Sequence, residues 1–322
     1  MKAIVYRKYG TPDVLSLQDV DPPVVGDDEV LVRVHAASLN PLDWHFTTGT
    51  PYLMRLMVGL RTPKRKIPGV DLAGTVESVG SNVARFKPGD EVFGFGVGSC
   101  AEFVAAREDR IAHQVADLTF EQAAAVPVAA VTALQGLRDH GKVEAGQKVL
   151  INGAAGGVGT FAVQIAKALR AEVTGVCSTH NVDTIRSIGA DHVVDYTKDD
   201  FVESGQRYDV MIDNVGNRSL SDCRKVLARD GICVVIGGPK EGRVLGPIPR
   251  LIRTLVYFKF VSQKVASYTA KASSEELLHL CEFLESGQVV PVIERTYNLN
   301  DVPEAMRYLG TGHARGKLVI NL

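Results

Sequence analysis

The sequence has few cysteines and almost no net charge. Its five cysteines are odd in number, widely separated and never spaced as C-x-x-C, so neither a disulfide framework nor a zinc knuckle is indicated. Thirty-six basic and thirty-seven acidic residues give a net charge of −1, which removes the bulk electrostatic argument for nucleic acid or an anionic membrane as a partner. These properties favour a small-molecule substrate and a reducing, cytoplasmic location.

A long hydrophobic run is also missing. The longest apolar-leaning stretch, residues 245–265, is interrupted by Pro247, Pro249 and basic side chains, whereas a membrane span needs about 20 predominantly apolar residues. Residues 1–6 alternate as in a strand and lack the apolar run of a signal peptide. We therefore expect no membrane partner and no export.

The length of 322 residues, of which 45% are hydrophobic, favours two domains. Short alternating segments such as 29–34 and 74–80 predict a mainly β domain in the first hundred residues. From residue 148, apolar strands alternate with helices, and this order predicts a doubly wound parallel sheet. The strands of that sheet are predicted over 148–152, 172–177, 192–196, 208–213 and 231–237.

Capping boxes mark two helix starts outside that sheet. Thr119 with Gln122 precedes an alanine-rich run, and Ser273 with Glu276 precedes a helix with one apolar face. The predicted face comprises Leu277, Leu280, Cys281 and Leu284. A further helix is predicted near Asp301, and residues 317–320 resemble a strand.

The most specific motif is a glycine-rich turn over residues 152–159, between an apolar strand and a helix. Gly153, Gly156 and Gly159 allow a tight turn, close approach of a pyrophosphate and close helix packing. An ordinary turn is the alternative, but the strand-turn-helix setting favours dinucleotide binding. A Walker loop is excluded because no Lys-Ser or Lys-Thr pair follows the glycines. The contacts predicted in this turn are Gly153, Ala154, Gly156, Gly157 and Val158.

The second predicted strand ends without a carboxylate, which bears on the choice of cofactor. An Asp or Glu there binds the ribose hydroxyls of NAD, and about 5 Å from a 2′-phosphate it would cost several kcal/mol. Here Ser178, Thr179 and His180 follow the strand instead, and all three can donate hydrogen bonds to a phosphate. Tyr196 is a further candidate, with strand capping as its alternative role. We therefore predict NADPH, with NADH as the alternative.

Four segments together resemble the medium-chain dehydrogenase/reductase superfamily: the glycine turn and residues 68–76, 86–93 and 190–196. Within it, the whole chain is similar to the zinc-free quinone oxidoreductase and alkenal reductase branch. The resemblance implies an α/β fold in which a GroES-like catalytic domain, residues 1–125 plus 288–322, encloses a Rossmann domain, residues 126–287. It also implies a homodimer.

The resemblance also implies that no metal site is present. Asn40 stands where zinc-dependent members place a cysteine ligand, and Val70-Asp71 stand where they place His-Glu. In the stretch that matches their structural-zinc lobe, only Cys100 occurs. We interpret His35 and His45 as ordinary polar residues. Without a Lewis acid, reduction of conjugated carbonyls is favoured over alcohol oxidation, because hydrogen-bond donors suffice for the developing oxyanion.

The resemblance nominates three catalytic residues. Asn40 and Asp43 belong to an N-P-x-D segment that lines the active site of this branch, with Asn40 orienting the substrate and Asp43 supporting it. A buried hydrogen bond within the loop is the alternative role of Asp43. Tyr52 lies one residue away from the position of a tyrosine in related enoyl reductases, and simple solvent exposure is its alternative. The basic segment 52–66 is interpreted as a solvated loop or a lid.

Contacts to the nicotinamide half of the cofactor are predicted from the family resemblance and from the position of ligands in parallel sheets. Thr132 matches a threonine near the nicotinamide ribose, with helix back-bonding as its alternative role. Ligands bind beyond the carboxyl ends of parallel strands, and this rule selects Asn214 with Val215, and Gly237 with Gly238, for which the role of an ordinary turn glycine is the alternative. Phe260 and Val261 resemble a segment that touches the carboxamide. Lys317, in the last strand, is expected to be a surface lysine.

These observations predict an NADPH-dependent enzyme that transfers hydride to quinones or α,β-unsaturated carbonyls. Two alternatives stay open. An enoyl-thioester reductase would share the fold and cofactor, and the basic stretch 61–66 would attract the phosphate of its substrate. A non-catalytic NADPH-binding redox sensor would bind the cofactor without oxidation by a carbonyl substrate; binding to nucleic acid is not favoured by the charge.

Overall fold

The computed structural model describes residues 1–238, 252, 257 and 261–322. Contacts within the chain divide it into two compact units. Unit 1 comprises Met1–Val131, Lys271–Glu285 and Pro291–Leu322, and unit 2 comprises Thr132–Ala270 and Ser286–Val290. Helix α9 (Ser274–Glu285) therefore belongs to unit 1 by its contacts. The domain limits given above, 1–125 plus 288–322 and 126–287, remain a prediction.

Unit 1 is built on a mainly antiparallel sheet of seven strands within the described residues, in the order β14-β15-β3-β4-β5-β7, with β6 paired to β3. The strands are β3 (Glu29–Leu39), β4 (Asp71–Val79), β5 (Glu91–Phe95), β6 (Phe103–Arg107), β7 (Ile111–His113), β14 (Ile293–Asn298) and β15 (Lys317–Asn321). The last strand, β15, pairs with β3, and Leu318 lies opposite Leu39. A separate pair of strands consists of β1 (Lys2–Val5) and β2 (Ser16–Asp19).

Three helices of unit 1 begin where the sequence predicts, after Thr119, after Ser273 and after Asp301. The helices of this unit within the described residues are α1 (Pro41–Thr48), α2 (Arg55–Val58), α3 (Phe120–Ala124), α9 and α10 (Val302–Thr311), with short 3-10 turns at Pro12–Val14, Tyr52–Met54, Glu108–Arg110 and Leu299–Asp301. Thr119 caps α3 and forms the predicted capping box with Gln122. The predicted apolar face of α9 is buried.

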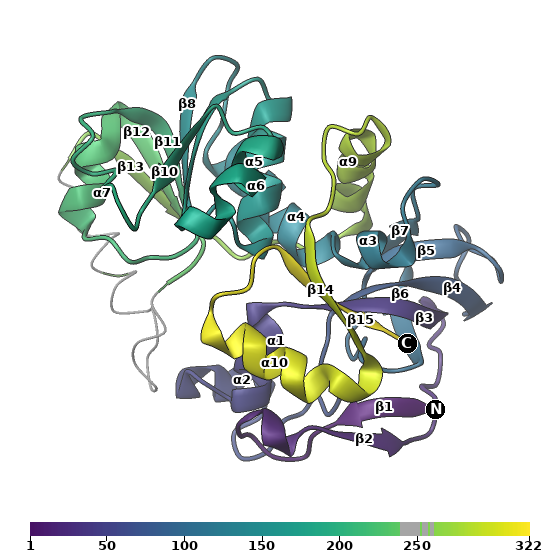
Figure 1. The fold of residues 1–322 in the computed structure, drawn as a ribbon. Helices are drawn as coiled ribbons and strands as arrows, with labels where there is room; N and C mark the ends of the chain where they lie inside the picture. Colours follow the sequence, from purple (N-terminus) through teal and green to yellow (C-terminus); the bar gives the residue numbers. More distant parts are fainter. Residues whose placement is uncertain (239–251, 253–256, 258–260) are drawn as a thin grey trace. The chain divides into compact units, whose positions relative to one another are not determined.

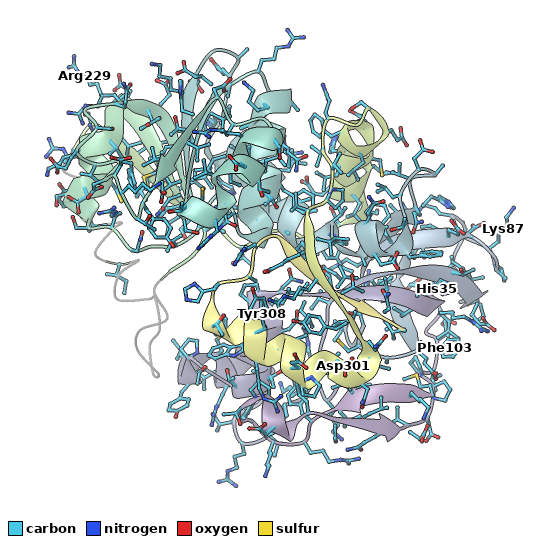
Figure 2. All side chains as sticks on the ribbon, viewed as in Figure 1. His35, Lys87, Phe103, Arg229, Asp301 and Tyr308 are labelled. Carbon is cyan, nitrogen blue, oxygen red and sulfur yellow. The ribbon has the colours of Figure 1, made fainter. Side chains whose placement is uncertain are left out.

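The C-terminal helix α10 is fixed to the sheet by a polar contact as well as by its apolar side. Its N-cap residue is Asp301, and Tyr308 lies along the same helix, as Figure 2 shows. The hydroxyl of Tyr308 donates to Glu294 of β14 over 2.6 Å. Val302 and Met306 of α10 are buried in the core of unit 1. The helix therefore covers the end of the sheet that β14 and β15 form.

Unit 2 contains the predicted doubly wound parallel sheet. Within the described residues it has six strands in the order β10-β9-β8-β11-β12-β13, and every neighbouring pair is parallel. The strands are β8 (Lys148–Asn152), β9 (Glu172–Cys177), β10 (His192–Asp195), β11 (Tyr208–Asp213), β12 (Leu227–Val235) and β13 (Lys264–Ser267). The apolar side chains on both faces of this sheet are buried, as is typical of a parallel sheet.

Helices connect these parallel strands by crossovers. They are α5 (Gly157–Ala168), α6 (Val182–Ser187) and α7 (Leu220–Val226), and a short helix, Thr179–Asn181, precedes α6. Figure 1 shows α5 and α6 on one face of the sheet and α7 on the other. Helix α4 (Pro127–Gln135) contains the boundary between the two units, and one π-helical turn, Gly136–His140, follows it.

Two properties of the described residues bear on partners. All five cysteines are buried, and none of them forms a disulfide bond. No helix in the described part of the chain combines the length and apolarity needed to cross a bilayer.

Candidate functional site

The glycine turn lies at the switch point of the parallel sheet. Strand β8 has β9 on one side and β11 on the other, so the chain order reverses between β8 and β11. The turn leaves the carboxyl end of β8 at Asn152, and α5 begins at Gly157. Ligands of open α/β sheets bind beyond the strand ends at this position.

The three glycines of the turn serve different purposes. A β-carbon on Gly159 would lie 2.1 Å from the carbonyl oxygen of Gly153, so residue 159 must be glycine for the helix to pack. Gly153 has φ +80°, and a β-carbon there would also meet Val215 at 2.6 Å. A β-carbon on Gly156 would meet nothing closer than 3.6 Å, so the structure itself leaves this position open.

The open position coincides with an uncapped helix start. Gly156 is the N-cap residue of α5, and no side chain caps that helix. The amides at the start of a helix lack intrahelical partners and attract anions, and the helix dipole adds to this attraction. The predicted contacts Gly157 and Val158 lie in this first turn and are half-buried, whereas Ala154 is fully buried. The turn therefore fits the pyrophosphate of a dinucleotide.

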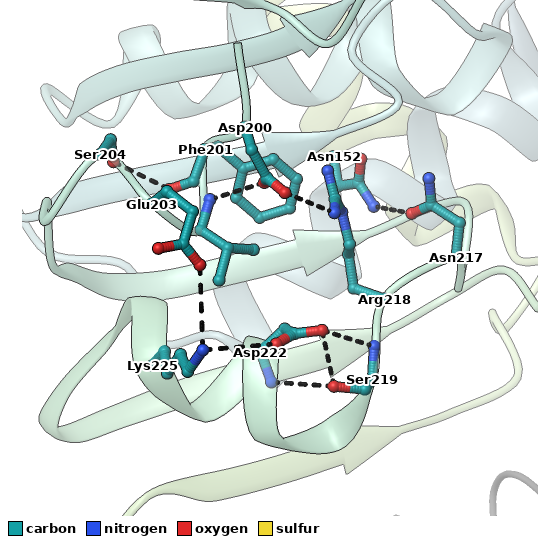
Figure 3. Close-up of polar contacts among 11 residues, drawn as sticks. Asn152, Asp200, Phe201, Glu203, Ser204, Asn217, Arg218, Ser219, Asp222 and Lys225 are labelled. Carbon is teal, nitrogen blue, oxygen red and sulfur yellow. Dashed lines mark hydrogen bonds and ion pairs between the residues drawn. The ribbon is translucent and has the colours of Figure 1, made fainter.

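Polar contacts tie the loop after β11 to the end of β8. The amide nitrogen of Asn152 donates to Asp213 over 2.9 Å and to Asn217 over 3.0 Å. Figure 3 shows the second of these bonds beside the ion pair of Arg218 and Asp200, whose atoms are 2.9 Å apart. The two loops that flank the switch point are thus held against each other.

The side chain of Asn214 has polar atoms available for a ligand. Both its amide nitrogen and its amide oxygen are buried, and neither has a hydrogen-bond partner in the described part of the chain. Asn214 directly follows β11, and Val215 next to it is 38% exposed. A buried amide without partners costs free energy unless a ligand or water completes its bonds. This position fits the prediction that Asn214 and Val215 contact the nicotinamide half.

The positions of the other residues predicted to contact the nicotinamide half neither support nor exclude such contacts. A β-carbon on Gly237 would lie 1.9 Å from the carbonyl oxygen of Asn214, so Gly237 has a structural reason to be glycine; Gly238 beside it is half-buried. The carbonyl of Thr132 accepts a hydrogen bond from the Tyr268 hydroxyl. Val261 packs on the core of unit 2, and Phe260 lies outside the described residues. Cofactor contacts by all of these remain predictions.

The structure places Ser178 and Tyr196 at the same edge of the sheet. Strands β9 and β10 pair Cys177 with Asp195, and the two candidates directly follow these residues. Ser178 accepts a hydrogen bond from Asn181 over 3.0 Å, which leaves its own proton for another acceptor. Tyr196 is 54% exposed, and His180 is exposed as well.

Thr179 is not available as the phosphate donor that the sequence suggested. Its hydroxyl donates to Asp195 over 2.6 Å, and Thr197 donates to the same carboxylate over 2.7 Å. A hydroxyl has one proton, so Thr179 has none left for a phosphate. The hydrogen bond from Thr179 is the largest cause that holds the pKa of Asp195 far below its ordinary value.

A second group of polar residues lies inside unit 1, at the start of α1. Pro41 is the first helical residue, and Asn40 is the N-cap. The carboxylate of Asp43 accepts from the backbone amides of Asn40 and Gly69, over 2.8 Å and 3.1 Å. Burial raises the pKa of Asp43 to about 7. These contacts agree with the alternative role of Asp43, a buried hydrogen bond within the loop.

The side chain of Asn40 takes part in a buried network that we call the Asn40 cluster: Ser38, Asn40, Asp71 and Lys317. The amide nitrogen of Asn40 donates to Asp71 over 2.8 Å, and its amide oxygen accepts from the Lys317 ammonium over 2.7 Å. The ammonium also lies 3.3 Å from Asp71. Asn40 and Lys317 are 3% and 2% exposed, and Asp71 is fully buried.

The carboxylate of Asp71 is fully bonded. Besides Asn40 and Lys317, the Ser38 hydroxyl donates to it over 2.9 Å and the backbone amide of Val128 over 3.0 Å. The interpretation of Lys317 as a surface lysine is therefore wrong, because β15 lies between β14 and β3 in the sheet and its first residue is bonded into this buried network. The sequence marks Lys317 only as the first residue of the predicted strand 317–320, and that pattern does not distinguish a buried lysine from an exposed one.

Tyr52 is not brought into the Asn40 cluster. It is 42% exposed, and its hydroxyl has no hydrogen bond within the described residues. Its ring lies 4.6 Å from the guanidinium of Arg55, which also stacks on Tyr9 at 4.5 Å. A catalytic role of Tyr52 remains a prediction.

Two family models and several relatives match the chain. Residues 26–166 match the alcohol dehydrogenase GroES-like domain, and residues 188–320 match the zinc-binding dehydrogenase model. The chain is 35% identical to the 2-methylene-furan-3-one reductase of Solanum lycopersicum over 100% of its length and 79% of the relative. It is 33% identical to the chloroplastic NADPH-dependent alkenal/one oxidoreductase of Arabidopsis thaliana, covering 99% of the chain and 79% of the relative.

A solved structure with the same fold is the Escherichia coli quinone oxidoreductase complexed with NADPH. Its TM-score is 0.85 at 27% identity, and the match covers 100% of both chains. The chain belongs to the medium-chain dehydrogenase/reductase superfamily, as the predicted resemblance implied.

The residues present do not fit the zinc ion that the name of the second family model implies. Structural and catalytic zinc sites use three or four Cys, His or acidic ligands, and the positions discussed above hold Asn40, Val70 and Asp71. Asn40 and Asp71 already bind the Lys317 ammonium. Within the described residues, no group of three or more His, Cys, Asp and Glu side chains is arranged to hold a metal ion.

Proposed function

We propose that this protein is an NADPH-dependent oxidoreductase that transfers hydride to quinones or α,β-unsaturated carbonyls without a metal ion. The open glycine turn at the switch point is the observation that carries the proposal. Relatives named as an NADPH-dependent alkenal/one oxidoreductase and a quinone oxidoreductase complexed with NADPH support it.

The residues of unit 2 bind and orient the dinucleotide. The amides at the start of α5 hold the pyrophosphate over Gly156, and the unpartnered amide of Asn214 binds the nicotinamide half. Ser178, His180 and Tyr196 donate hydrogen bonds to the 2′-phosphate. Bound NADPH supplies the hydride.

The Asn40 cluster supplies the hydrogen bond to the electron acceptor. One N–H of the Asn40 amide is used by Asp71, and the second has no partner among the described residues. That N–H donates to the carbonyl oxygen of an enone or quinone. When hydride adds to the β-carbon of an enone, the π-electron pair moves to this oxygen, and a proton from solvent completes the reduction. A donor aimed at such a charge lowers the barrier by about 3 kcal/mol.

Within the described residues no side-chain cluster suited to a metal ion is found, and this chemistry does not require one. An unactivated alcohol needs a Lewis acid to stabilise its alkoxide. A conjugated carbonyl is already electrophilic, so that positioned donors and proximity suffice. The Asn40 amide that donates to the acceptor oxygen in this proposal is itself bonded to the buried Lys317 ammonium.

A second candidate, reduction of enoyl thioesters, rests on the basic segment 61–66. Arg61, Lys64 and Lys66 are exposed, and residues 44–70 contain no acidic side chain. Such a surface attracts the phosphates of a coenzyme A thioester. A comparison of NADPH oxidation by thioester and non-thioester acceptors separates this candidate from the first.

The test is turnover of NADPH with matched acceptors. We expect NADPH oxidation with a quinone or an alkenal, and a lower kcat/KM with the corresponding enoyl-coenzyme A. A higher kcat/KM for the thioester would favour the second candidate. Tight NADPH binding without oxidation by any of the three acceptor classes would contradict both and indicate a redox sensor.

A further inference from the structure

Lys317 has an unusual place for a lysine, because its charge is buried and shared between two side chains. Its ammonium donates to the Asn40 amide oxygen and to Asp71, over 2.7 Å and 3.3 Å. These contacts bring together the end of β3, the start of β4 and the start of β15. Unlike the surface pairs of this protein, the Lys317–Asp71 pair is almost fully withdrawn from water.

Stability alone does not account for such a pair. Burying two charges costs hydration free energy that their attraction repays only in part, and apolar replacements of similar size are often as stable. The bonds of the Asn40 amide point to another role. Lys317 fixes the oxygen and Asp71 fixes one N–H, so the direction of the second N–H is determined.

We propose that Lys317 is a positioning residue that orients and polarises the Asn40 carboxamide for the carbonyl oxygen of the acceptor. This inference rests on the proposed function, because Asn40 is the donor there. An ammonium bonded to the amide oxygen draws electron density from the amide and makes its free N–H a stronger donor. Because water is excluded, this effect is not screened.

The charge of Asp71 does not cancel this effect. Its carboxylate is also bonded by Ser38 and by the Val128 amide at the start of α4, so its negative charge is spread over four donors. The ammonium bonds to Asn40 at a shorter distance than to Asp71. Lys317 is hydrogen-bonded directly to the Asn40 amide. Its positive charge therefore favours the negative charge that develops on the acceptor oxygen bonded to that amide.

The decisive variant is the double substitution Lys317→Met with Asp71→Asn, because Lys317→Met alone leaves a buried carboxylate without its cation. The double variant removes both charges and keeps Asn40. A matched control is Lys167→Met with Asp191→Asn, which removes a lysine–aspartate pair 2.7 Å apart in unit 2. Circular dichroism and thermal unfolding establish that each variant is folded. Lys317→Arg, which keeps the charge, is the conservative variant.

Two measurements follow. In steady-state turnover, we expect kcat of the double variant to fall about tenfold or more, less than the 10²–10³-fold loss typical of deleting a donor. The dissociation constant of NADPH should change by less than about twofold (about 0.4 kcal/mol). The control should keep wild-type kcat, and Lys317→Arg should recover part of the loss.

The second measurement does not depend on turnover. 4-Nitrophenol, whose phenolate resembles the developing oxyanion, is bound to the NADP⁺ complex, and its ionised fraction is measured by absorbance. The wild-type protein should raise that fraction relative to free 4-nitrophenol, and the double variant should not.

The outcomes separate this inference from the proposed function. Wild-type kcat and wild-type ionisation of 4-nitrophenol in the double variant would overturn the role of Lys317 and leave the proposed function standing. No increase in ionisation by the wild-type protein would overturn it as well. A wild-type protein that ionises 4-nitrophenol but reduces no acceptor would contradict the proposed function and retain the role of Lys317.

Discussion

At the scale of single residues, Gly156 and Gly159 allow ligand binding and folding to be separated. A β-carbon at Gly156 would make only an ordinary van der Waals contact, 3.6 Å from the Gly153 carbonyl oxygen, and the φ of −78° suits any residue. We expect Gly156→Ala to lower the free energy of unfolding by about 1 kcal/mol or less, because the one expected cost is that alanine is a poorer N-cap residue than glycine. The added methyl group occupies the space of the pyrophosphate, so the dissociation constant of NADPH should rise about tenfold or more. Quenching of protein fluorescence measures it.

Gly159→Ala is the matched control. Its β-carbon would lie 2.1 Å from the Gly153 carbonyl oxygen, so the backbone must shift. We expect a loss of about 1–3 kcal/mol in the free energy of unfolding, measured by urea titration. If Gly156→Ala bound NADPH as tightly as the wild-type protein, the turn would not hold the pyrophosphate.

Asp43 should make stability depend on pH. Burial raises its folded pKa to about 7, well above the value of about 3.9 in an unfolded chain. The folded state therefore binds the proton more tightly. The contribution of Asp43 is complete below the unfolded pKa and is lost as pH rises through about 7, with a slope of up to about 1.4 kcal/mol per pH unit.

Asp43→Asn removes this titration. Urea unfolding of both proteins from about pH 5 to about pH 8 should show that the wild-type protein loses more stability than the variant over this range. Comparing the two slopes cancels the other titrating groups. Equal slopes would show that the Asp43 carboxyl does not titrate in that window.

At the scale of elements, helices α1 and α10 pack closely at Trp44 and Gly310. Gly310 of α10 lies under the indole of Trp44 in α1, and a β-carbon there would be 2.5 Å from the indole nitrogen. Trp44 is the one tryptophan of the sequence, so protein fluorescence reports this contact directly. We expect Gly310→Ala to shift the emission maximum and to lower stability by about 1–3 kcal/mol.

The effect should extend to catalysis, because Asn40 is the N-cap residue of α1. We expect kcat of Gly310→Ala to fall, whereas Glu304→Ala, an exposed change on the same helix, should leave emission and kcat unchanged. An unshifted emission spectrum in Gly310→Ala would mean that the helices accommodate the methyl group without moving Trp44.

Elements with a local signal were predictable from the sequence. The strand from residue 148 to residue 152 and the helix capped by Thr119 occur where alternation and capping chemistry indicate them. Helix α1 was not predicted, although Asn40 before Pro41 is a helix-start signal, because the segment was interpreted by its resemblance to an active-site loop. The glycine turn was recognisable because all its determinants lie within eight residues.

The Asn40 cluster was not predictable in this way. Asn40 and Lys317 are separated by 277 positions, and only the pairing of β15 with β3 brings their side chains together. A local pattern carries no information about such a pairing, so a lysine at a strand start is interpreted as a surface residue. For the same reason, the bond from Thr179 to Asp195 could not be foreseen.

At the scale of the whole molecule, cofactor binding should raise thermal stability. A ligand that binds only the folded state stabilises it by about 2.7 kcal/mol at a concentration a hundred times its dissociation constant. We expect NADPH to raise Tm more than NADH does at equal concentration, because Ser178, His180 and Tyr196 lie at the proposed 2′-phosphate position. Equal shifts would contradict the preference for NADPH. A homodimer and a cytoplasmic location remain predictions.

The central claim is that NADPH reduces a conjugated carbonyl or quinone here without a metal ion. The direct test is NADPH oxidation by protein dialysed against a chelator, with its zinc content determined by elemental analysis. We expect full turnover of a quinone or enone by the metal-free protein, and no increase when zinc is added. Turnover that appears only with added zinc, or only with simple alcohols and NADP⁺, would contradict it.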